Sequence, residues 1–157
     1  MSSAVHLARS RTYPAGTKRA FETLLPYELN RLFDRRYVAI PPIKRVENRG
    51  GTWGTPGQTR TVLLAGGGSM RERLVEVQSP RVFSYHLDEV KGPMKALVRS
   101  VDGAWEFEKA GTGVRITWRW TVHPRGRAGA LAMPLFGRMW QGYARQALEN
   151  IERLLVH

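Results

Sequence analysis

The sequence predicts an α+β domain in which a curved antiparallel sheet of about seven strands is covered by one long C-terminal helix. From residue 43 to residue 125, short runs rich in Val, Leu, Thr and aromatic residues are separated by Gly and Pro, which is typical of successive antiparallel strands. In the last part of the chain, apolar residues instead recur at the spacing of an amphipathic helix. The 157 residues suffice for one domain and are too few for two of ordinary size, so we assign residues 1–157 to a single domain.

Residues 4–12 are predicted to form the first strand, and two short helices follow it. The first helix has Thr17 as its expected N-cap and ends before Pro26. The second helix is indicated by apolar residues at helical spacing, Leu29, Leu32 and Phe33. Six more strands are predicted after the helices, over residues 43–49, 57–65, 69–78, 81–90, 96–109 and 113–123.

The final helix has the clearest periodic pattern in the chain. Pro134 is expected in its first turn, where the missing N–H of proline costs nothing. Its apolar face is formed by Phe136, Met139, Trp140, Tyr143, Ala147, Leu148, Ile151, Leu154 and Leu155. Polar and charged residues fill the opposite face, so we expect the apolar face to lie on the sheet.

The turn expected at residues 110–113 sorts the residues of its two strands onto two faces. Pairing across this turn puts Trp105 opposite Trp118 on an apolar side. The same pairing puts Glu108 opposite Arg115 on a charged side. Such a separation is expected for a sheet that buries one face and exposes the other to water.

The apolar face of this sheet is wider than one helix, so the remaining space is either filled by aromatic side chains or left as a cavity. Pockets between such layers are mostly apolar, with a few convergent polar groups. Pairing across Ser79-Pro80 and parity with Trp105 predict three inward polar side chains, Glu72, Tyr85 and Arg99. These groups either contact a ligand or satisfy the core itself, with Arg99 paired to a glutamate and the Tyr85 hydroxyl hydrogen-bonded.

Composition and spacing disfavour several classes of site. The chain has no cysteine, which excludes disulfides, thiolate zinc sites and cysteine nucleophiles. The four histidines (His6, His86, His123 and His157) lie far apart at spacings that do not suit a metal, so we expect neither a metal nor another cofactor. No apolar run has the length of a signal peptide or a membrane span, and we therefore expect a cytoplasmic domain.

The net charge of +12 invites a nucleic-acid or membrane interpretation. The basic residues are spread along the chain without a basic block or a recognition helix, which disfavours nucleic acid as a partner. If the first strand neighbours the last, Arg9 and Arg11 are expected to join Arg115 and Arg119 in a basic patch on the outer face of the sheet.

A second surface pattern lies at the start of the final helix. Leu131, Met133, Leu135 and Phe136 stand beside Arg125, Arg127 and Arg138. This segment is either the packed beginning of the helix or a gate that makes transient contact with an anionic membrane.

Several segments of the chain resemble a known superfamily: Gly57-Gln-Thr-Arg-Thr-Val-Leu, Met70-Arg-Glu-Arg-Leu, Phe83-Ser-Tyr-His-Leu, Thr112-Gly-Val-Arg-Ile-Thr-Trp-Arg-Trp and the final helix. With the order of the elements, they make the chain similar to the SRPBCC superfamily, whose START-like domains have the helix-grip fold. In detail the chain resembles the bacterial polyketide cyclase/dehydrase-like branch. The resemblance implies a START-like ligand-binding domain over residues 1–157, with a hydrophobic cavity between sheet and C-terminal helix for lipids, polyketides or other apolar molecules.

The predicted faces and the resemblance together name the candidate site. Ligand-binding residues are expected at Glu72, Leu74, Phe83, Trp105, Phe107, Trp118, Trp120, Phe136, Met139, Trp140 and Tyr143. Certain cyclase relatives use a cavity arginine and tyrosine, which Arg99 and Tyr85 match by rough position as catalytic candidates. We therefore favour binding of a hydrophobic small molecule. The alternatives are a cyclase- or dehydrase-type enzyme acting on such a ligand and a basic-surface module for anionic membrane or nucleic acid.

Overall fold

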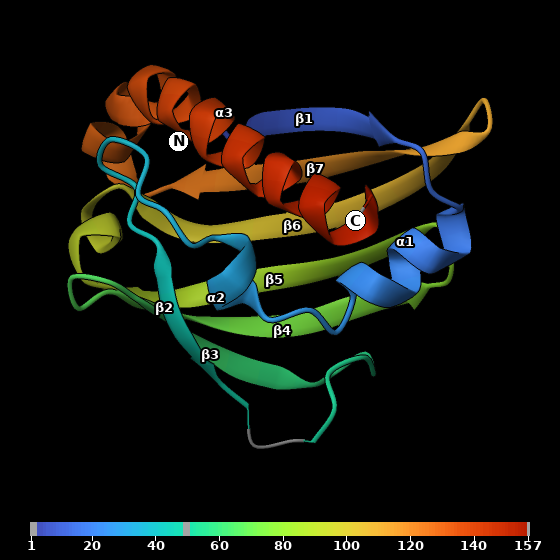
Figure 1. Cartoon of the computed structure of the whole chain (residues 1–157). Coiled ribbons are helices and arrows are strands. Elements are labelled where there is room, and N and C mark those ends of the chain that lie inside the picture. Colours follow the sequence, from blue (N-terminus) through green and yellow to red (C-terminus); the bar gives the residue numbers. More distant parts are fainter. Residues whose placement is uncertain (1–2, 49–50, 157) are drawn as a thin grey trace.

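The computed structural model describes residues 3–48 and 51–156 and contains one seven-stranded sheet with helices on one side (Figure 1). All neighbouring strands are antiparallel, in the order β1-β7-β6-β5-β4-β3-β2. The strands are β1 (Val5–Tyr13), β2 (Ile43–Glu47), β3 (Thr59–Leu64), β4 (Ser69–Gln78), β5 (Val82–Lys91), β6 (Val98–Ala110) and β7 (Gly113–Pro124). The helices are α1 (Thr17–Leu24), α2 (Leu29–Leu32), α3 (Gly126–Val156) and a short 3-10 helix (Pro93–Ala96). The predicted helix-grip architecture is confirmed.

The strand registers explain why the predicted faces separate so cleanly. In the β6–β7 hairpin, Trp105 lies opposite Trp118 and Glu108 lies opposite Arg115, as predicted. Pairing across Ser79-Pro80 also predicts Leu74 opposite Tyr85, which is confirmed, and Glu76 opposite Phe83, which is wrong. A register shift between Leu74 and Glu76 puts Glu76 opposite Ser84 instead. One bulge is enough to change which residues share a face, because side chains alternate with a period of two.

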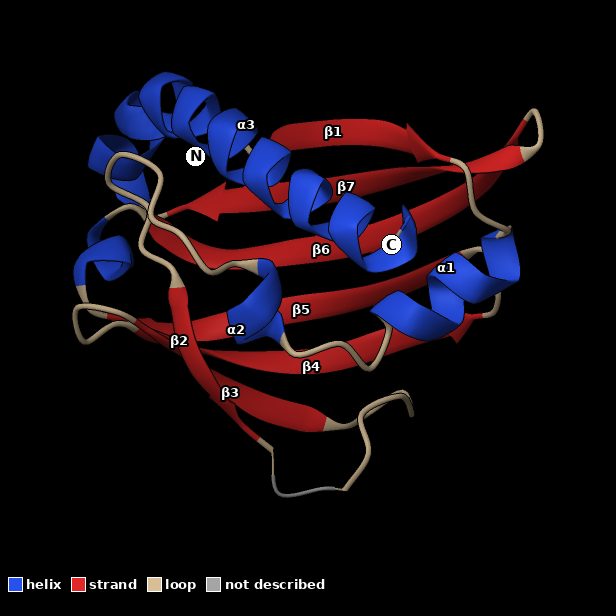
Figure 2. Cartoon of the chain, in the orientation of Figure 1, coloured by secondary structure: helices blue, strands red, loops and turns tan. Residues whose placement is uncertain are grey.

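The concave face of the sheet is covered by three helices rather than by α3 alone. Helix α3 lies over β1 and β7, and α1 and α2 cover the other half of the sheet (Figure 2). Phe21 of α1 packs edge-on against Phe83 and Phe107, with ring centroids 5.6 and 5.2 Å apart. The helix pair therefore fills part of the space that the sequence assigned to aromatic plugs or to a cavity.

Two predicted helix starts are wrong. Gly16, not Thr17, is the N-cap of α1, and no side-chain oxygen caps the helix. Helix α3 begins at Gly126, so Pro134 lies inside it instead of in its first turn. Small and apolar residues before Pro134 extend the helix backwards, and its first turns run at an angle to the rest (Figure 1). No helix in the described ranges is long and apolar enough to cross a membrane.

Strand β1 is tied to α3 by polar side chains that point inward. Arg9 lies opposite Trp118, and its guanidinium donates to the backbone carbonyl of Gln141 (3.1 Å). Arg11 pairs with Glu152 of α3 (2.9 Å). The expected outer patch of Arg9 and Arg11 with Arg115 and Arg119 is therefore wrong, although β1 does neighbour β7. The register puts these two arginines on the helix side, where their long stems cover apolar surface.

Tyr13 is the last residue of β1 and makes a buried contact with α3. Its hydroxyl donates to the carbonyl oxygen of Leu148 at 2.6 Å. We expect Tyr13→Phe to lower the free energy of unfolding by about 1 kcal/mol, the usual net value of one buried hydrogen bond. Urea unfolding followed by circular dichroism measures this, with Tyr27→Phe as a matched control on a half-buried ring. Equal losses in both variants would contradict a special role for the Tyr13 hydroxyl.

Candidate functional site

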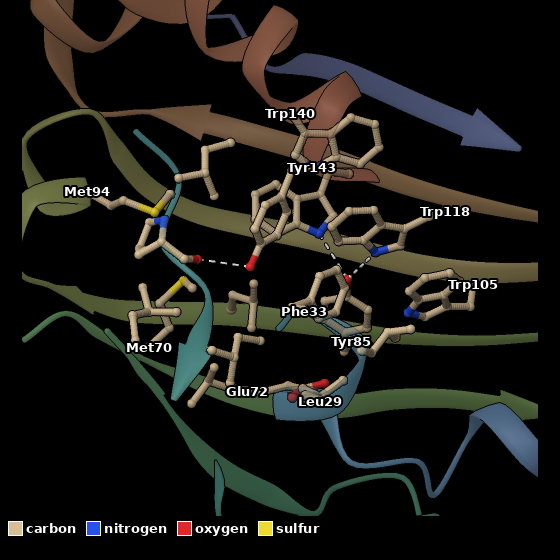
Figure 3. A pocket seen from close by; sticks show the side chains of 18 of the residues that line it. Leu29, Phe33, Met70, Glu72, Tyr85, Met94, Trp105, Trp118, Trp140 and Tyr143 are labelled. Carbon is tan, nitrogen blue, oxygen red and sulfur yellow. Dashed lines mark hydrogen bonds between the residues drawn. The ribbon is translucent and has the colours of Figure 1, made fainter. Parts of the chain in front are cut away.

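An apolar pocket lies between α2, the segment before β2, α3 and the concave face of the sheet (Figure 3). Its cavity volume is about 60 Å³, which is room for only a handful of water molecules. Eight predicted ligand-binding residues line it: Glu72, Phe83, Trp105, Trp118, Trp120, Phe136, Trp140 and Tyr143. The catalytic candidate Tyr85 lines it as well.

Three predicted residues do not line the pocket. Phe107 is buried against Phe21 of α1, and Leu74 of β4 is buried opposite Tyr85. Met139 is half-buried on α3 but points elsewhere. Leu29, Leu32 and Phe33 were missed because the helix pair was not expected to reach the site. Lining residues on other elements were missed as well, among them Ile40, Arg60, Met70 and Met94. The helical spacing of Leu29, Leu32 and Phe33 could have identified the α2 side.

Aromatic rings occupy most of the space between α3 and the sheet. Trp118 stacks on Trp105 of β6 and on Trp140 of α3, with ring centroids 5.3 and 4.7 Å apart. Phe33 stacks on Tyr143 at 5.3 Å. The Tyr143 hydroxyl donates to the carbonyl of Pro41 (3.0 Å), which holds the segment before β2 against α3. The pocket is thus what remains beside a tightly packed aromatic cluster.

The Tyr85 hydroxyl is the polar centre of this cluster. It accepts hydrogen bonds from the indole nitrogens of Trp118 (2.7 Å) and Trp120 (2.9 Å). An indole N–H is only a donor, so these two bonds use both acceptor positions of the hydroxyl and leave its proton to be donated. Within the described residues, no protein acceptor takes that proton. Burial raises the pKa of Tyr85, so the group stays neutral and keeps its proton.

The position of Tyr85 depends on a glycine in the neighbouring strand. Gly103 lies directly opposite Tyr85 and also opposite Trp120. A Cβ atom at Gly103 would lie 2.2 Å from the Tyr85 ring. The tyrosine ring therefore lies flat across β6 and can reach the two indoles of β7 only because residue 103 has no side chain.

A buried ion pair lies beside this aromatic centre. Arg60 donates to Glu72 at 2.8 Å, with side-chain exposures of only 8% and 5%. The Arg60 guanidinium also stacks 3.9 Å from the ring centroid of Trp53. Burial raises the pKa of Glu72, while Arg60 opposes that shift by stabilising the carboxylate. Arg60, which was not predicted, is thus the partner of Glu72.

Arg99 lies exposed and does not line the pocket, so its predicted inward orientation is wrong. The pairing of β6 with β7 shifts between Val98 and Ser100 and leaves Arg99 in a bulge. Val98 takes the inward position and is fully buried. The pair of Arg99 and Tyr85 that a carbonyl-polarising enzyme would need is therefore not assembled.

Two of the histidines that lie far apart in the sequence meet on the outer face of the sheet. Asp102 accepts from His86 Nδ1 (2.7 Å) and from His123 Nε2 (2.9 Å). Burial raises the pKa of Asp102, but the hydrogen bonds from the two histidines outweigh it and the net shift is downward. No group of three or more acidic or histidine side chains in the described ranges is arranged to hold a metal ion.

Solved structures with this fold come from distant proteins. The chain superposes on ginseng major latex-like protein 151 from Panax ginseng with a TM-score of 0.71 and 10% identity, over 98% of each chain. For Ara h 8.0201 the TM-score is 0.65 and the identity 15%, over 98% of this chain and 99% of that one. For the protein XoxI from Bacillus cereus the values are 0.65 and 18%, over 97% and 96%. At these identities the likeness shows the fold alone.

The sequence itself identifies the family. No curated protein matches the chain in sequence. A family model does match, over residues 4–156, and it describes polyketide cyclase / dehydrase and lipid transport proteins. The match includes every element that builds the pocket, so the resemblance to the SRPBCC superfamily is confirmed. The chain belongs to the polyketide cyclase / dehydrase and lipid transport family and has its helix-grip fold.

Proposed function

We propose that the protein binds a hydrophobic small molecule with an oxygen acceptor, and that the Tyr85 hydroxyl donates to this oxygen. The observation that carries the proposal is that Tyr85 lines a mostly apolar pocket, and that its hydroxyl already accepts two hydrogen bonds while no protein acceptor among the described residues takes its proton. A buried donor without an acceptor is costly in a protein interior, and a ligand oxygen would remove that cost. The family's description as lipid transport and polyketide proteins supports the same chemistry of ligand.

The present volume of the pocket limits the size of the ligand that fits without rearrangement. Drug-sized ligands occupy pockets of about 300–1,000 Å³, so a lipid needs this pocket to widen. The partly exposed lining residues Leu29 and Met94 form its rim. Both side chains are unbranched at Cβ and adapt to a guest more readily than the stacked tryptophans do. Small bicyclic molecules are therefore suitable first probes.

The test compares 1-tetralone with tetralin, which differ in one carbonyl oxygen. Titration followed by tryptophan fluorescence is expected to show about tenfold tighter binding of tetralone, the value of one hydrogen bond near 1.4 kcal/mol. Tyr85→Phe should bind both molecules equally. Tyr27→Phe, a tyrosine that does not line the pocket, should keep the preference.

The outcomes separate the two parts of the proposal. If neither molecule binds to the wild-type protein and native mass spectrometry finds no co-purified apolar ligand, the binding function is wrong. If both bind equally well to wild type and to Tyr85→Phe, the pocket is a binding site and the role of the hydroxyl is wrong.

A further inference from the structure

One face of α3 carries exposed leucines between arginines. Leu131 is 83% exposed and Leu135 is 64% exposed. Arg127 and Arg138 are exposed on the same side, because residues three or four apart lie on the same face of a helix. We call these four residues the outer stripe of α3. It points away from the buried face that contains Met133, Phe136 and Trp140. Large exposed apolar side chains at neighbouring positions mark an interaction surface.

The segment between α2 and β2 extends the outer stripe. The ring of Tyr37 occupies the place of a side chain at Gly142, where a Cβ would lie 2.0 Å from it. The next residue, Val38, is 70% exposed and has a φ of 53°. A β-branched residue rarely adopts this left-handed conformation, so the fold holds the Val38 side chain in water against its preference.

The charged residues in the part of the chain that contains the outer stripe are all basic. The chain has no aspartate or glutamate from residue 109 to residue 148, a range that includes all of the outer stripe. No carboxylate in the described ranges forms an ion pair with Arg127 or Arg138. The arginines of the outer face of the sheet differ, because Arg115 pairs with Glu108 and Arg119 pairs with Glu106. The arginines of the stripe thus remain available to anions.

We propose that the outer stripe of α3, with Val38, docks the protein on an anionic lipid bilayer. Leucines that enter the acyl boundary and arginines that contact anionic headgroups are the recognised chemistry of helices lying on a membrane. A second copy of the chain fits less well, since a two-fold contact would bring the unpaired arginines together. Nucleic acid would contact the arginines but would leave the leucines without an apolar partner.

The segment that carries Val38 also borders the pocket, because its residues Ile40 and Pro41 line it. Phe136, on the buried face of α3 opposite the stripe, lines the pocket as well. Docking would therefore place the junction between α3 and the segment that carries Val38 against the lipid. A hydrophobic ligand could then pass between membrane and pocket without crossing water. This last step rests on the proposed function, whereas docking itself does not.

Vesicle flotation tests the docking. Vesicles of phosphatidylcholine alone are compared with vesicles that also contain phosphatidylglycerol, at low ionic strength and at about 0.15 M salt. Wild-type protein is expected to bind only the anionic vesicles, less tightly at higher salt. Leu131→Gln/Leu135→Gln and Arg127→Gln/Arg138→Gln should each weaken binding about tenfold or more. The control Arg115→Gln/Arg119→Gln removes the same charge from arginines that already have carboxylate partners. It should change the vesicle affinity less than threefold, which corresponds to about 0.6 kcal/mol.

Three results would overturn the proposal. The first is equal loss in the two arginine variants with none in the leucine variant, which would indicate general charge attraction. The second is a wild-type dimer in analytical ultracentrifugation that Leu131→Gln/Leu135→Gln dissociates. The third is binding of duplex DNA that competes with the vesicles and survives the leucine changes. Because the stripe is outside the pocket, the leucine variant should still bind tetralone, so a failure of docking and a failure of ligand binding are distinguishable.

Discussion

Gly103→Ala is expected to lower the free energy of unfolding by about 3 kcal/mol, because overpacking a filled core has costs of this order. The added Cβ would lie 2.2 Å from the Tyr85 ring, which is bounded by tryptophans and cannot move aside freely. Displacing Tyr85 would also break its hydrogen bonds to Trp118 and Trp120. Alanine lowers the backbone entropy of the unfolded chain relative to glycine, but that gain in stability is only about 0.5–1 kcal/mol. The clash therefore dominates.

Urea unfolding measures this loss, and tryptophan emission reports the broken indole bonds. Gly16→Ala is the matched control, since a Cβ there would meet nothing within 4 Å and the backbone is already extended. Because Gly16 is the N-cap of α1 and alanine caps a helix less well than glycine, this control should lower stability by at most about 1 kcal/mol. A Gly103→Ala variant as stable as Gly16→Ala, with unchanged tryptophan emission, would show that Tyr85 does not need the glycine.

Arg60→Met is expected to be the other severe substitution, at about 4 kcal/mol near neutral pH, because it leaves the Glu72 carboxylate buried without its partner. Glu72 and Arg60 are both almost fully buried in the pocket wall. The change also removes the guanidinium that stacks on Trp53. The double variant Arg60→Met/Glu72→Met should regain most of the loss, since two packed apolar side chains replace a buried ion pair without leaving a charge.

The same variant should lose stability as the pH rises. Burial already raises the pKa of Glu72 above its ordinary value of 4.5, and removing Arg60 takes away the charge that opposes this shift. A carboxyl with a raised pKa in the folded state stabilises the fold fully below the unfolded pKa and loses that contribution as pH increases. The deficit of Arg60→Met against wild type should therefore be small near pH 4 and largest at about pH 8. A deficit independent of pH would mean that lost packing, and not the unpaired carboxylate, is responsible.

The strands were predictable because each shows a recognisable pattern in its local sequence. Near the hairpin turn, over residues 105–108 and 114–120, apolar residues alternate with polar or charged ones, so one turn determined the pairing of Trp105 with Trp118. The long helix was equally visible, since its apolar face has a period that only a helix can bury on one side. The aromatic part of the pocket wall followed from these two patterns.

Other features of the site could not be predicted because they depend on contacts between distant segments. The bulge at Arg99 reverses the orientation of one side chain, and no local signal distinguishes it from regular alternation. The partner of Glu72 is Arg60, whose place on β3 depends on the register with β4. His86 and His123 meet at Asp102 only because β5, β6 and β7 lie side by side.

By itself, the sequence of this protein determined the antiparallel sheet with its long covering helix, the inward faces of β6 and β7 near their hairpin turn, and the aromatic content of the pocket. These follow from periodicities of two and of about 3.6 residues, which the chain displays without tertiary information. Only the tertiary structure decided how the polar groups of the pocket are partnered: Tyr85 with Trp118 and Trp120, over Gly103, and Glu72 with Arg60. A buried polar group needs a partner from another strand or helix, and the choice of partner depends on register, bulges and packing.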